Sequence, residues 1–404
     1  MVRLPRPIKV STLVTCLLFV GLAARSDGGA FESACTGDPV PAATLLIPYF
    51  EIDLADTNGK TTLISVTNAG GQATLAHLVL WTDWGLPTLA FDLFLAANDV
   101  QSVNLRDLFA GALPVTGGGS FAGCTNPLVL PTLDDAALEA LRRQHTGQPD
   151  GQQRCAGSGR AGANIALGYL TIDVVQACSP TIHFPTSNGY FEAGGSGIAA
   201  NDNVLLGDFF LVDAAANLAQ GGEAAHIVAD EARFGGRTQT FYSRWIDRTG
   251  EDARAPLGTQ YRARFLNGGL FSGGTDLAVW AEPSLALPAA VLCDEREESV
   301  DVCQLLSYSV FDEAGAGQEL PTEALVTEVT ARIPVGGTEI PTAIQFGFVD
   351  VANRELRGCD FSIGQPPIQV VPLQSYVVAL HSASGRFAVG FNAARTRDEL
   401  CQAP

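Results

Sequence analysis

The sequence predicts an all-β protein of two antiparallel, immunoglobulin-like β-sandwich domains, the first of which carries a short helical insertion. Two observations support this class. Short segments rich in β-branched and aromatic residues follow one another and are bounded by Gly, Pro, Asn or Asp. In one of them, Val100, Val103 and Leu105 nearly alternate with polar residues, as in a strand with one face in a core. Close spacing of such segments favours an antiparallel sandwich.

The expected strands fill both halves of the chain. We place the first domain at residues 31–236 and the second at 237–404, after a signal peptide. The segments predicted as strands are 44–54, 61–68, 74–84, 89–95, 99–109, 165–178, 203–217, 223–234, 238–246, 259–266, 275–282, 303–312, 324–333, 343–351, 368–380 and 385–393.

One segment, near residues 124–155, changes to a helical period. Leu133, Ala137, Leu138 and Leu141 fall on one helical face. Thr132 is expected to cap the N-terminus, and Gly147 to close the C-terminus.

The first residues have the pattern of an export signal. Basic residues at 3, 6 and 9 precede an apolar run from 10 to 24, which is short for a membrane span. We expect cleavage after Ala23, with Ala30 as a second candidate. Removal of residues 1–23 takes away three basic and no acidic residues, so the net charge falls from −19 to −22. Such an acidic chain repels nucleic acid and anionic lipid, so we expect neither as a partner.

The cysteines indicate disulfides. Nine are present, and eight remain once Cys16 leaves with the signal. An even number in an exported chain favours disulfides, although eight cysteines allow 105 pairings. Local loops suggest Cys124–Cys155 around the helix and Cys293–Cys303 around an acidic stretch. Elimination then leaves Cys35–Cys178 and Cys359–Cys401. No two cysteines have zinc-site spacing, so we expect no metal.

Residues 53–68 resemble a binding loop at first sight, because Gly59-Lys60-Thr61 is reminiscent of a phosphate-binding loop. That loop needs a glycine where Leu54 stands, and a calcium loop needs an oxygen ligand at the same position. Asn58-Gly59 between two strands instead predicts a type I′ hairpin turn, with Lys60 serving solubility.

Signatures of nucleophilic hydrolases are absent from the sequence. The serines in GGGSFAG and GGSG are followed by Ala122 and Ile198 where a nucleophile elbow needs glycine. The five histidines have no close metal-ligand spacing, and the many acidic residues do not single out a catalytic pair. We therefore expect no cofactor and name no catalytic residue.

Seven arginines lie between Arg233 and Arg264, interleaved with aromatic residues. Guanidinium groups pair with carboxylates and aromatic faces stack on sugars, so this patch could bind an acidic glycan. The alternative is that these arginines pair with the protein's own carboxylates, which we favour. The candidate ligand-binding residues are Arg237, Arg244, Trp245, Arg248, Tyr261 and Arg262.

These observations together favour an exported, non-enzymatic structural, adhesive or ligand-binding protein of the periplasm or cell surface. Its partner would be a glycan or another surface protein. The alternative is a secreted carbohydrate-active hydrolase that uses a carboxylate pair.

Overall fold

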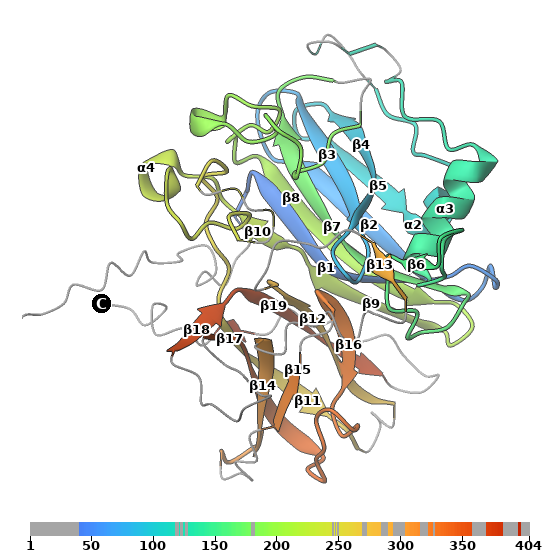
Figure 1. The fold of residues 1–404 in the computed structure, drawn as a ribbon, viewed down its shortest axis with the longest axis vertical. Helices are drawn as coiled ribbons and strands as arrows, with labels where there is room; N and C mark the ends of the chain where they lie inside the picture. The colour runs from blue at the N-terminus through green and yellow to red at the C-terminus, as the bar shows by residue number, and fades with distance from the viewer. Residues whose placement is uncertain are drawn as a thin grey trace, which may run out of the picture.

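The structure of the protein is a computed structural model. It describes residues 40–117, 121, 124–125, 128–178, 182–244, 246, 248, 250–268, 273–283, 290–293, 304–315, 322–325, 328–357, 369–382 and 395–396. The protein is mostly β, with several antiparallel sheets and a few short helices, so the predicted all-β class is confirmed at this level (Figure 1). The immunoglobulin-like character of the two halves stays a prediction.

Two sheets from the first half share one core. One has the strand order β10-β1-β7-β3-β4 and the other the order β5-β2-β8-β9. Leu45, Leu78 and Ile172 from the first sheet meet Val66 and Phe209 from the second, and all five side chains are buried. The strands are β1 (Thr44–Asp53), β2 (Lys60–Asn68), β3 (Thr74–Trp81), β4 (Pro87–Leu95), β5 (Val100–Asn104), β7 (Ile165–Val175), β8 (Leu205–Asp213), β9 (Leu218–Glu223) and β10 (Ala225–Ile227).

In the second half of the chain, two further sheets also share one core. One has the order β15-β14-β17-β11-β20, with β18 also paired to β17, and the other the order β16-β12-β19. Phe265, Tyr308, Val349, Val279 and Val377 meet in their core. The strands are β11 (Gln260–Leu266), β12 (Gly274–Ala281), β14 (Gln304–Asp312), β15 (Thr322–Leu325), β16 (Thr330–Pro334), β17 (Phe346–Arg357), β18 (Gln369–Leu373), β19 (Ser375–Ser382) and β20 (Arg395–Thr396).

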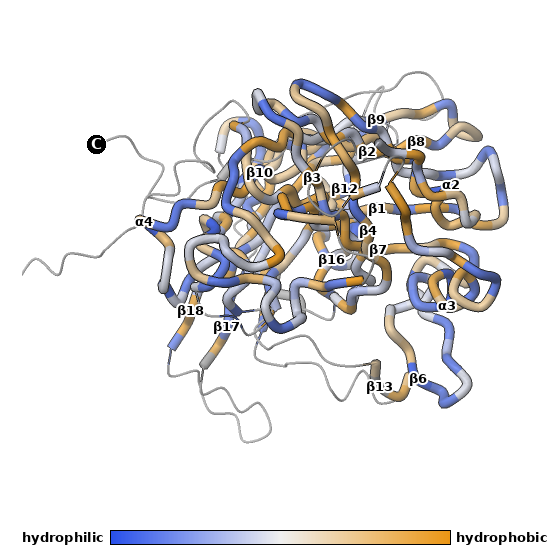
Figure 2. Tube along the Cα trace, turned by 90° about the horizontal axis from the view of Figure 1, so that it is seen from above, coloured by the Kyte–Doolittle hydropathy of each residue, from blue (hydrophilic) through white to orange (hydrophobic). Residues whose placement is uncertain are grey.

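A third buried cluster lies on the other face of the β10-β1-β7-β3-β4 sheet. It is rich in aromatic side chains, among them Trp81, Tyr169, Tyr190, Tyr242 and Trp280. Trp280 belongs to β12, so this cluster joins the two halves of the chain. Figure 2 shows apolar segments around β1, β4 and β7 and hydrophilic segments at outer turns.

The helices are short. They are α2 (Leu105–Phe109), α3 (Asp135–His145) and α4 (Glu231–Phe234), with a 3-10 turn at Ala193–Gly195. The predicted helix is confirmed as α3, but its N-cap is Asp134 and not Thr132. The Asp134 carboxylate accepts a hydrogen bond from Ala137 N at 2.8 Å, where a negative charge also meets the positive end of the helix dipole. Gly147 follows the helix with a φ of +65°, as expected for a glycine that closes it. Within the part of the chain that the structure describes, no helix is long and apolar enough to cross a membrane.

The predicted Asn58-Gly59 hairpin is wrong. β1 pairs with β7 and β10, whereas β2 pairs with β5 and β8, so the turn carries the chain from one sheet to the facing sheet. Neither residue has the positive φ that a type I′ turn requires, and Gly59 N donates to Asp56 O at 3.0 Å. Arg106 holds the turn through hydrogen bonds to the backbone oxygens of residues 57, 59 and 60.

The predicted strand at 238–246 is also wrong. Its described residues form turns, because Asp252 accepts hydrogen bonds from the Thr240 hydroxyl and from Tyr242 N at 3.1 Å. Phe241 and Tyr242 are buried in the aromatic cluster, so their apolar character reflects tertiary packing and not a sheet. The predicted strand at 385–393 lies outside the described residues.

The disulfides differ from the predicted pairs. The structure joins Cys124 to Cys178 and Cys155 to Cys293. The predicted Cys124–Cys155 bridge is therefore wrong, and Cys293–Cys303 and Cys35–Cys178 are wrong with it because each needs a sulfur that is already bonded. Cys359–Cys401 lies outside the described residues. Both disulfides are consistent with an oxidising, extracytoplasmic location.

The pairing through Cys155 has a clear cause in the fold. Cys155 lies in β6 (Arg154–Cys155), which pairs with β13 (Val291–Leu292), and Cys293 follows β13 directly. This contact spans 138 residues of sequence, so local spacing cannot reveal it. The predicted domain boundary at 236/237 stays a prediction.

Candidate functional site

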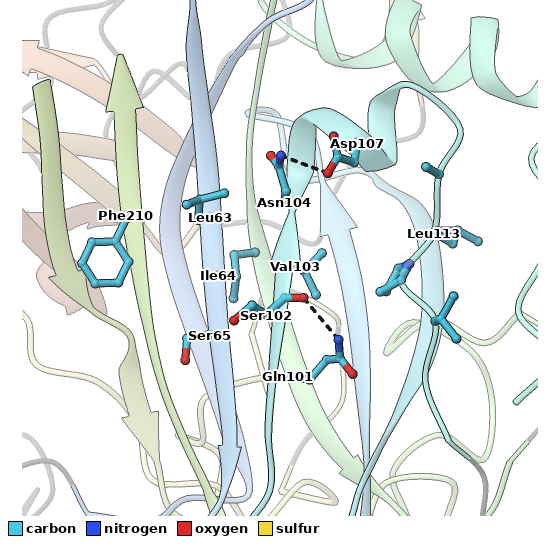
Figure 3. A pocket seen from close by; sticks show the side chains of 13 residues that line it. Leu63, Ile64, Ser65, Gln101, Ser102, Val103, Asn104, Asp107, Leu113 and Phe210 are labelled. Carbon is cyan, nitrogen blue, oxygen red and sulfur yellow. Dashed lines mark hydrogen bonds between the residues drawn. The ribbon is translucent and has the colours of Figure 1, made fainter. Parts of the chain in front are cut away.

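A groove of about 540 Å³ runs along the outer part of the β5-β2-β8-β9 sheet (Figure 3). Its floor comes from β2, β5 and β8, and its opposite wall from the segment that follows α2. The lining residues are Leu63, Ile64, Ser65, Gln101, Ser102, Val103, Asn104, Asp107, Ala112, Leu113, Pro114, Val115 and Phe210.

The strand register brings two apolar side chains of the floor together. Leu63 lies opposite Asn104 of β5 on one side and opposite Phe210 of β8 on the other, so the three form one row across the sheet. Phe210 in turn lies opposite Gly221, and a Cβ added at Gly221 would come within 2.9 Å of the Phe210 ring. The missing side chain at Gly221 therefore lets the ring lie over β9.

The groove concentrates exposed apolar surface. Of the eight large apolar side chains that are exposed in the described part of the chain, Leu63, Val115 and Phe210 line the groove, and Val100 belongs to the same strand as Asn104. Phe210 is 43 % exposed and Val115 is 86 % exposed. Gathered exposed apolar groups indicate a binding surface, whereas scattered ones do not.

The polar lining is already ordered. The Asn104 amide donates to Asp107 Oδ2 at 3.0 Å, and its oxygen accepts from Arg106 N at 3.1 Å and from the Thr61 hydroxyl at 2.9 Å. Asp107 is the one ionisable residue among those that line the groove. This lining can therefore hold and orient a ligand, but it offers no second ionisable group for proton transfer.

A smaller cavity of about 140 Å³ lies between the two halves of the chain. Lys60 Nζ lies 2.5 Å from Glu51 Oε1, and Arg332 Nη1 lies 2.9 Å from Glu51 Oε2. Arg332 also pairs with Asp276 at 2.7 Å. Burial by itself raises the pKa of Glu51, but the positive charges of Arg332 and Lys60 outweigh it and hold that pKa below its usual range. These charges bind one another, so we interpret the cluster as a contact that fixes the two halves. Lys60, predicted to serve solubility, takes part in this contact.

The arginine patch is partly neutralised by the protein's own acids. Arg244 pairs with Glu355 at 2.5 Å, and Arg262 pairs with Asp350 at 2.6 Å. The Arg262 guanidinium also lies 4.3 Å from the centre of the Phe348 ring. Arg244 and Arg262 therefore pair with the protein's own carboxylates, which is the arrangement that the sequence analysis favours.

The other candidates of the patch are dispersed. Arg248 donates to Asn188 Oδ1 at 2.8 Å, and Arg237 donates to a backbone oxygen four residues earlier at 3.2 Å. Tyr261 is buried in the core of the second half, and Trp245 lies outside the described residues. None of the five described candidates lines the groove, and the role of all six in ligand binding stays a prediction.

Arg254, from the same stretch of sequence, is fully buried. Its Nε lies 3.6 Å from Asp173 Oδ1, and the Tyr190 and Tyr242 hydroxyls each donate to Asp173 Oδ2 at 2.9 Å. Burial and the nearby Asp173 raise the pKa of both tyrosines well above its usual range, so both keep their protons. Thr44 completes this network with a short hydrogen bond to Asp173. The network is structural, because its side chains are closed off from solvent.

Sequence reasoning missed the groove, although one signal was present. Phe209 and Phe210 are adjacent in a predicted strand, and neighbouring side chains in a strand point to opposite faces. When one of these two side chains points into the core, the other must therefore point to the opposite face of the sheet. In the structure Phe209 is buried and Phe210 is exposed.

Comparison with known proteins gives no further guide. No protein-family model matches the sequence, and no curated protein is significantly similar to it. The function must therefore be inferred from the geometry.

Proposed function

We propose that this chain is an extracytoplasmic, non-enzymatic binding protein that holds its ligand in the groove beside β5. Two immunoglobulin-like sandwich domains would supply the rigid support. The observation that carries the proposal is the clustering of exposed Leu63, Val115 and Phe210 in one hollow of about 540 Å³. Exposed apolar clusters of this kind mark interaction sites, and the volume is in the range of ligand pockets.

The chemistry of the lining favours binding over catalysis. Asp107 is the single ionisable residue of the groove, and Asn104 already donates to it. A carbohydrate-active hydrolase needs two carboxyl groups on either side of the bond that it cleaves. The groove supplies one, so we retain the binding function. The two disulfides support the extracytoplasmic location.

The test is a binding screen with the full mature chain on glycan and peptide arrays. Phe210→Asp places a charge on the apolar floor and should weaken binding of any groove ligand at least tenfold, which is about 1.4 kcal/mol. Val370→Asp is the matched control, because Val370 is 52 % exposed but lies on β18 in the second half. Equal binding by the wild type and the Phe210→Asp variant would overturn the proposal, and so would turnover of the ligand.

A further inference from the structure

We infer that the occupant of the groove is an extended polypeptide segment of another protein, which adds as a strand to the free edge of β5. This inference rests on the proposed function, because it names the class of ligand for the same groove. It goes further in assigning recognition to the backbone of β5 and not to the side chains around it.

The register shows which backbone groups of β5 are free to pair. Asn68 N donates to Asp99 O at 2.9 Å, which fixes the hydrogen-bonding phase of the β2–β5 ladder. In an antiparallel ladder, every second residue turns its N–H and C=O toward the neighbouring strand. Gln101 and Val103 therefore face β2, whereas Val100, Ser102 and Asn104 direct these groups away from it.

Little in the described part of the chain covers this edge. Among the described residues, the hydrogen bond that reaches the Ser102 backbone is a long one, from the Gln101 side chain to Ser102 O at 3.3 Å (Figure 3). The Ser102 N–H has no partner in that part of the chain. Val100 N already donates to Asp99 Oδ1 at 2.9 Å, and Asn104 is the N-cap of α2. An added strand could therefore bond to both backbone groups of Ser102, with Val100 O and Asn104 N in reach on either side.

On two other edges of the same sheets, some backbone groups are already bonded. The Thr116 hydroxyl accepts from Phe94 N at 2.9 Å and donates to Phe94 O at 3.1 Å, so it occupies the outer side of β4. On β9, Glu223 O accepts from the Tyr376 hydroxyl of the second half at 3.3 Å. Proteins usually protect an exposed edge with a charge or a proline, and the β5 sequence VQSVN has neither. In the described part of the chain, the Ser102 N–H on β5 thus lacks a partner of the kind that Phe94 N and Glu223 O have, and the β5 sequence does not protect it.

The groove has the shape that an added strand needs. Its wall, residues 112–115, faces β5 across the hollow, with Leu113 and Pro114 in the lining. A paired strand would lie about 4.8 Å from β5, and its side chains would alternate between the outer face and this wall. The apolar wall favours apolar side chains on the inner positions.

Charge and hydrogen bonding select a peptide over a glycan. The polar atoms of the Asn104 side chain are already engaged, so they are poorly placed to bind sugar hydroxyls. The chain has a net charge of −22 without its signal, and Asp107 is the ionisable residue of the groove. The bound segment should therefore be neutral or basic, with a Lys or Arg near Asp107.

The experiment compares Ser102→Pro with Ser102→Ala. Proline removes the N–H that points away from β2 and leaves the β2–β5 ladder intact, which an edge strand tolerates. Short random peptides are selected by display on the full mature chain, and the best synthetic peptide is titrated by fluorescence anisotropy. We expect Ser102→Pro to bind this peptide at least about tenfold more weakly than Ser102→Ala, because one main-chain bond is lost and the ring blocks the edge.

A second measurement covers the case in which Ser102→Pro misfolds. Wild-type protein is titrated with the same peptide carrying a methyl group on each alternate backbone nitrogen, in both registers. The peptide methylated in one register should bind at least about tenfold more weakly, and the peptide methylated in the other register should bind as before, because only alternate N–H groups of an added strand pair with β5.

The outcomes separate the two proposals. Selected peptides or array glycans that depend on Phe210 but bind Ser102→Pro and Ser102→Ala alike would overturn strand addition and leave the groove as a binding site. Failure to select any peptide that binds Ser102→Pro more weakly than Ser102→Ala would also overturn strand addition. If no ligand of any class depends on Phe210, the proposed function itself fails.

Discussion

The buried network around Arg254 offers the sharpest test of how this fold is held together. Arg254→Met removes the guanidinium but keeps an unbranched side chain of similar length. Asp173 would remain fully buried, with hydrogen bonds from Tyr190 and Tyr242 but without a positive charge beside it. Removing one partner of a buried ion pair costs about 3–5 kcal/mol, because the other charge is left uncompensated. We expect a loss of unfolding free energy in this range.

The assay is urea unfolding of the oxidised protein, followed by tryptophan fluorescence and far-ultraviolet circular dichroism together. The double variant Arg254→Met/Asp173→Asn is the decisive control. It leaves no uncompensated charge at Asp173, so its loss should be smaller than the sum of the two single losses by about 1 kcal/mol or more. Tyr190→Phe should cost about 1.5–3 kcal/mol, because it removes one hydrogen bond to a charged acceptor. Additive losses, or a loss below about 1 kcal/mol for Arg254→Met, would refute the reasoning.

Three further predictions concern other buried features. Burial raises the pKa of Asp83 from 3.8 to about 7, so its carboxyl is protonated in the folded state but ionises on unfolding above pH 4. The free energy of unfolding should therefore fall as pH rises from about 4 to 7. Asp83→Asn should reduce this fall by about 2–3 kcal/mol between pH 5 and pH 8. Urea unfolding that gives parallel pH profiles for the wild type and the variant would contradict this prediction. Digestion without reduction should release one peptide pair joined through Cys155 and Cys293, and Cys155→Ser should lower stability by about 2–5 kcal/mol; mass spectrometry that finds either cysteine free or bonded elsewhere would disprove the assignment. Gly168→Ala should destabilise the protein by about 1–3 kcal/mol, because the new Cβ would lie 2.1 Å from the Trp81 carbonyl oxygen, and an unchanged urea midpoint would argue against this close approach.

The strands were accessible to sequence reasoning because their signal is local. Segment 165–178, for example, reads as β-branched and apolar, and β7 occupies Ile165–Val175. Which strands pair depends on contacts between distant parts of the chain, and local sequence does not contain this information. The local pattern at Asn58-Gly59 therefore predicts a hairpin, whereas in the structure this turn links two facing sheets. The same limit explains the wrong disulfide pairs.

The candidate sites failed in sequence reasoning for a related reason. A cluster of arginines along the sequence does not say where each side chain goes, and Arg254 turned inward to Asp173 while Arg262 turned to Asp350. The groove depends on Leu63 and Phe210 meeting across a strand pair that is separated by almost 150 residues. Residue spacing alone could indicate that Phe210 leaves the core, but not what it would lie beside.

The two disulfides interleave along the chain, since Cys155 lies between Cys124 and Cys178 while its own partner follows at Cys293. A chain that crosses a membrane from its N-terminus delivers Cys124 and Cys155 before either of their partners. An oxidase that joins thiols in the order of their arrival would therefore make the wrong bond first. For an exported chain we therefore expect correct pairing to depend on a disulfide isomerase or on delayed oxidation, and a host that lacks such an isomerase should accumulate the misbridged form.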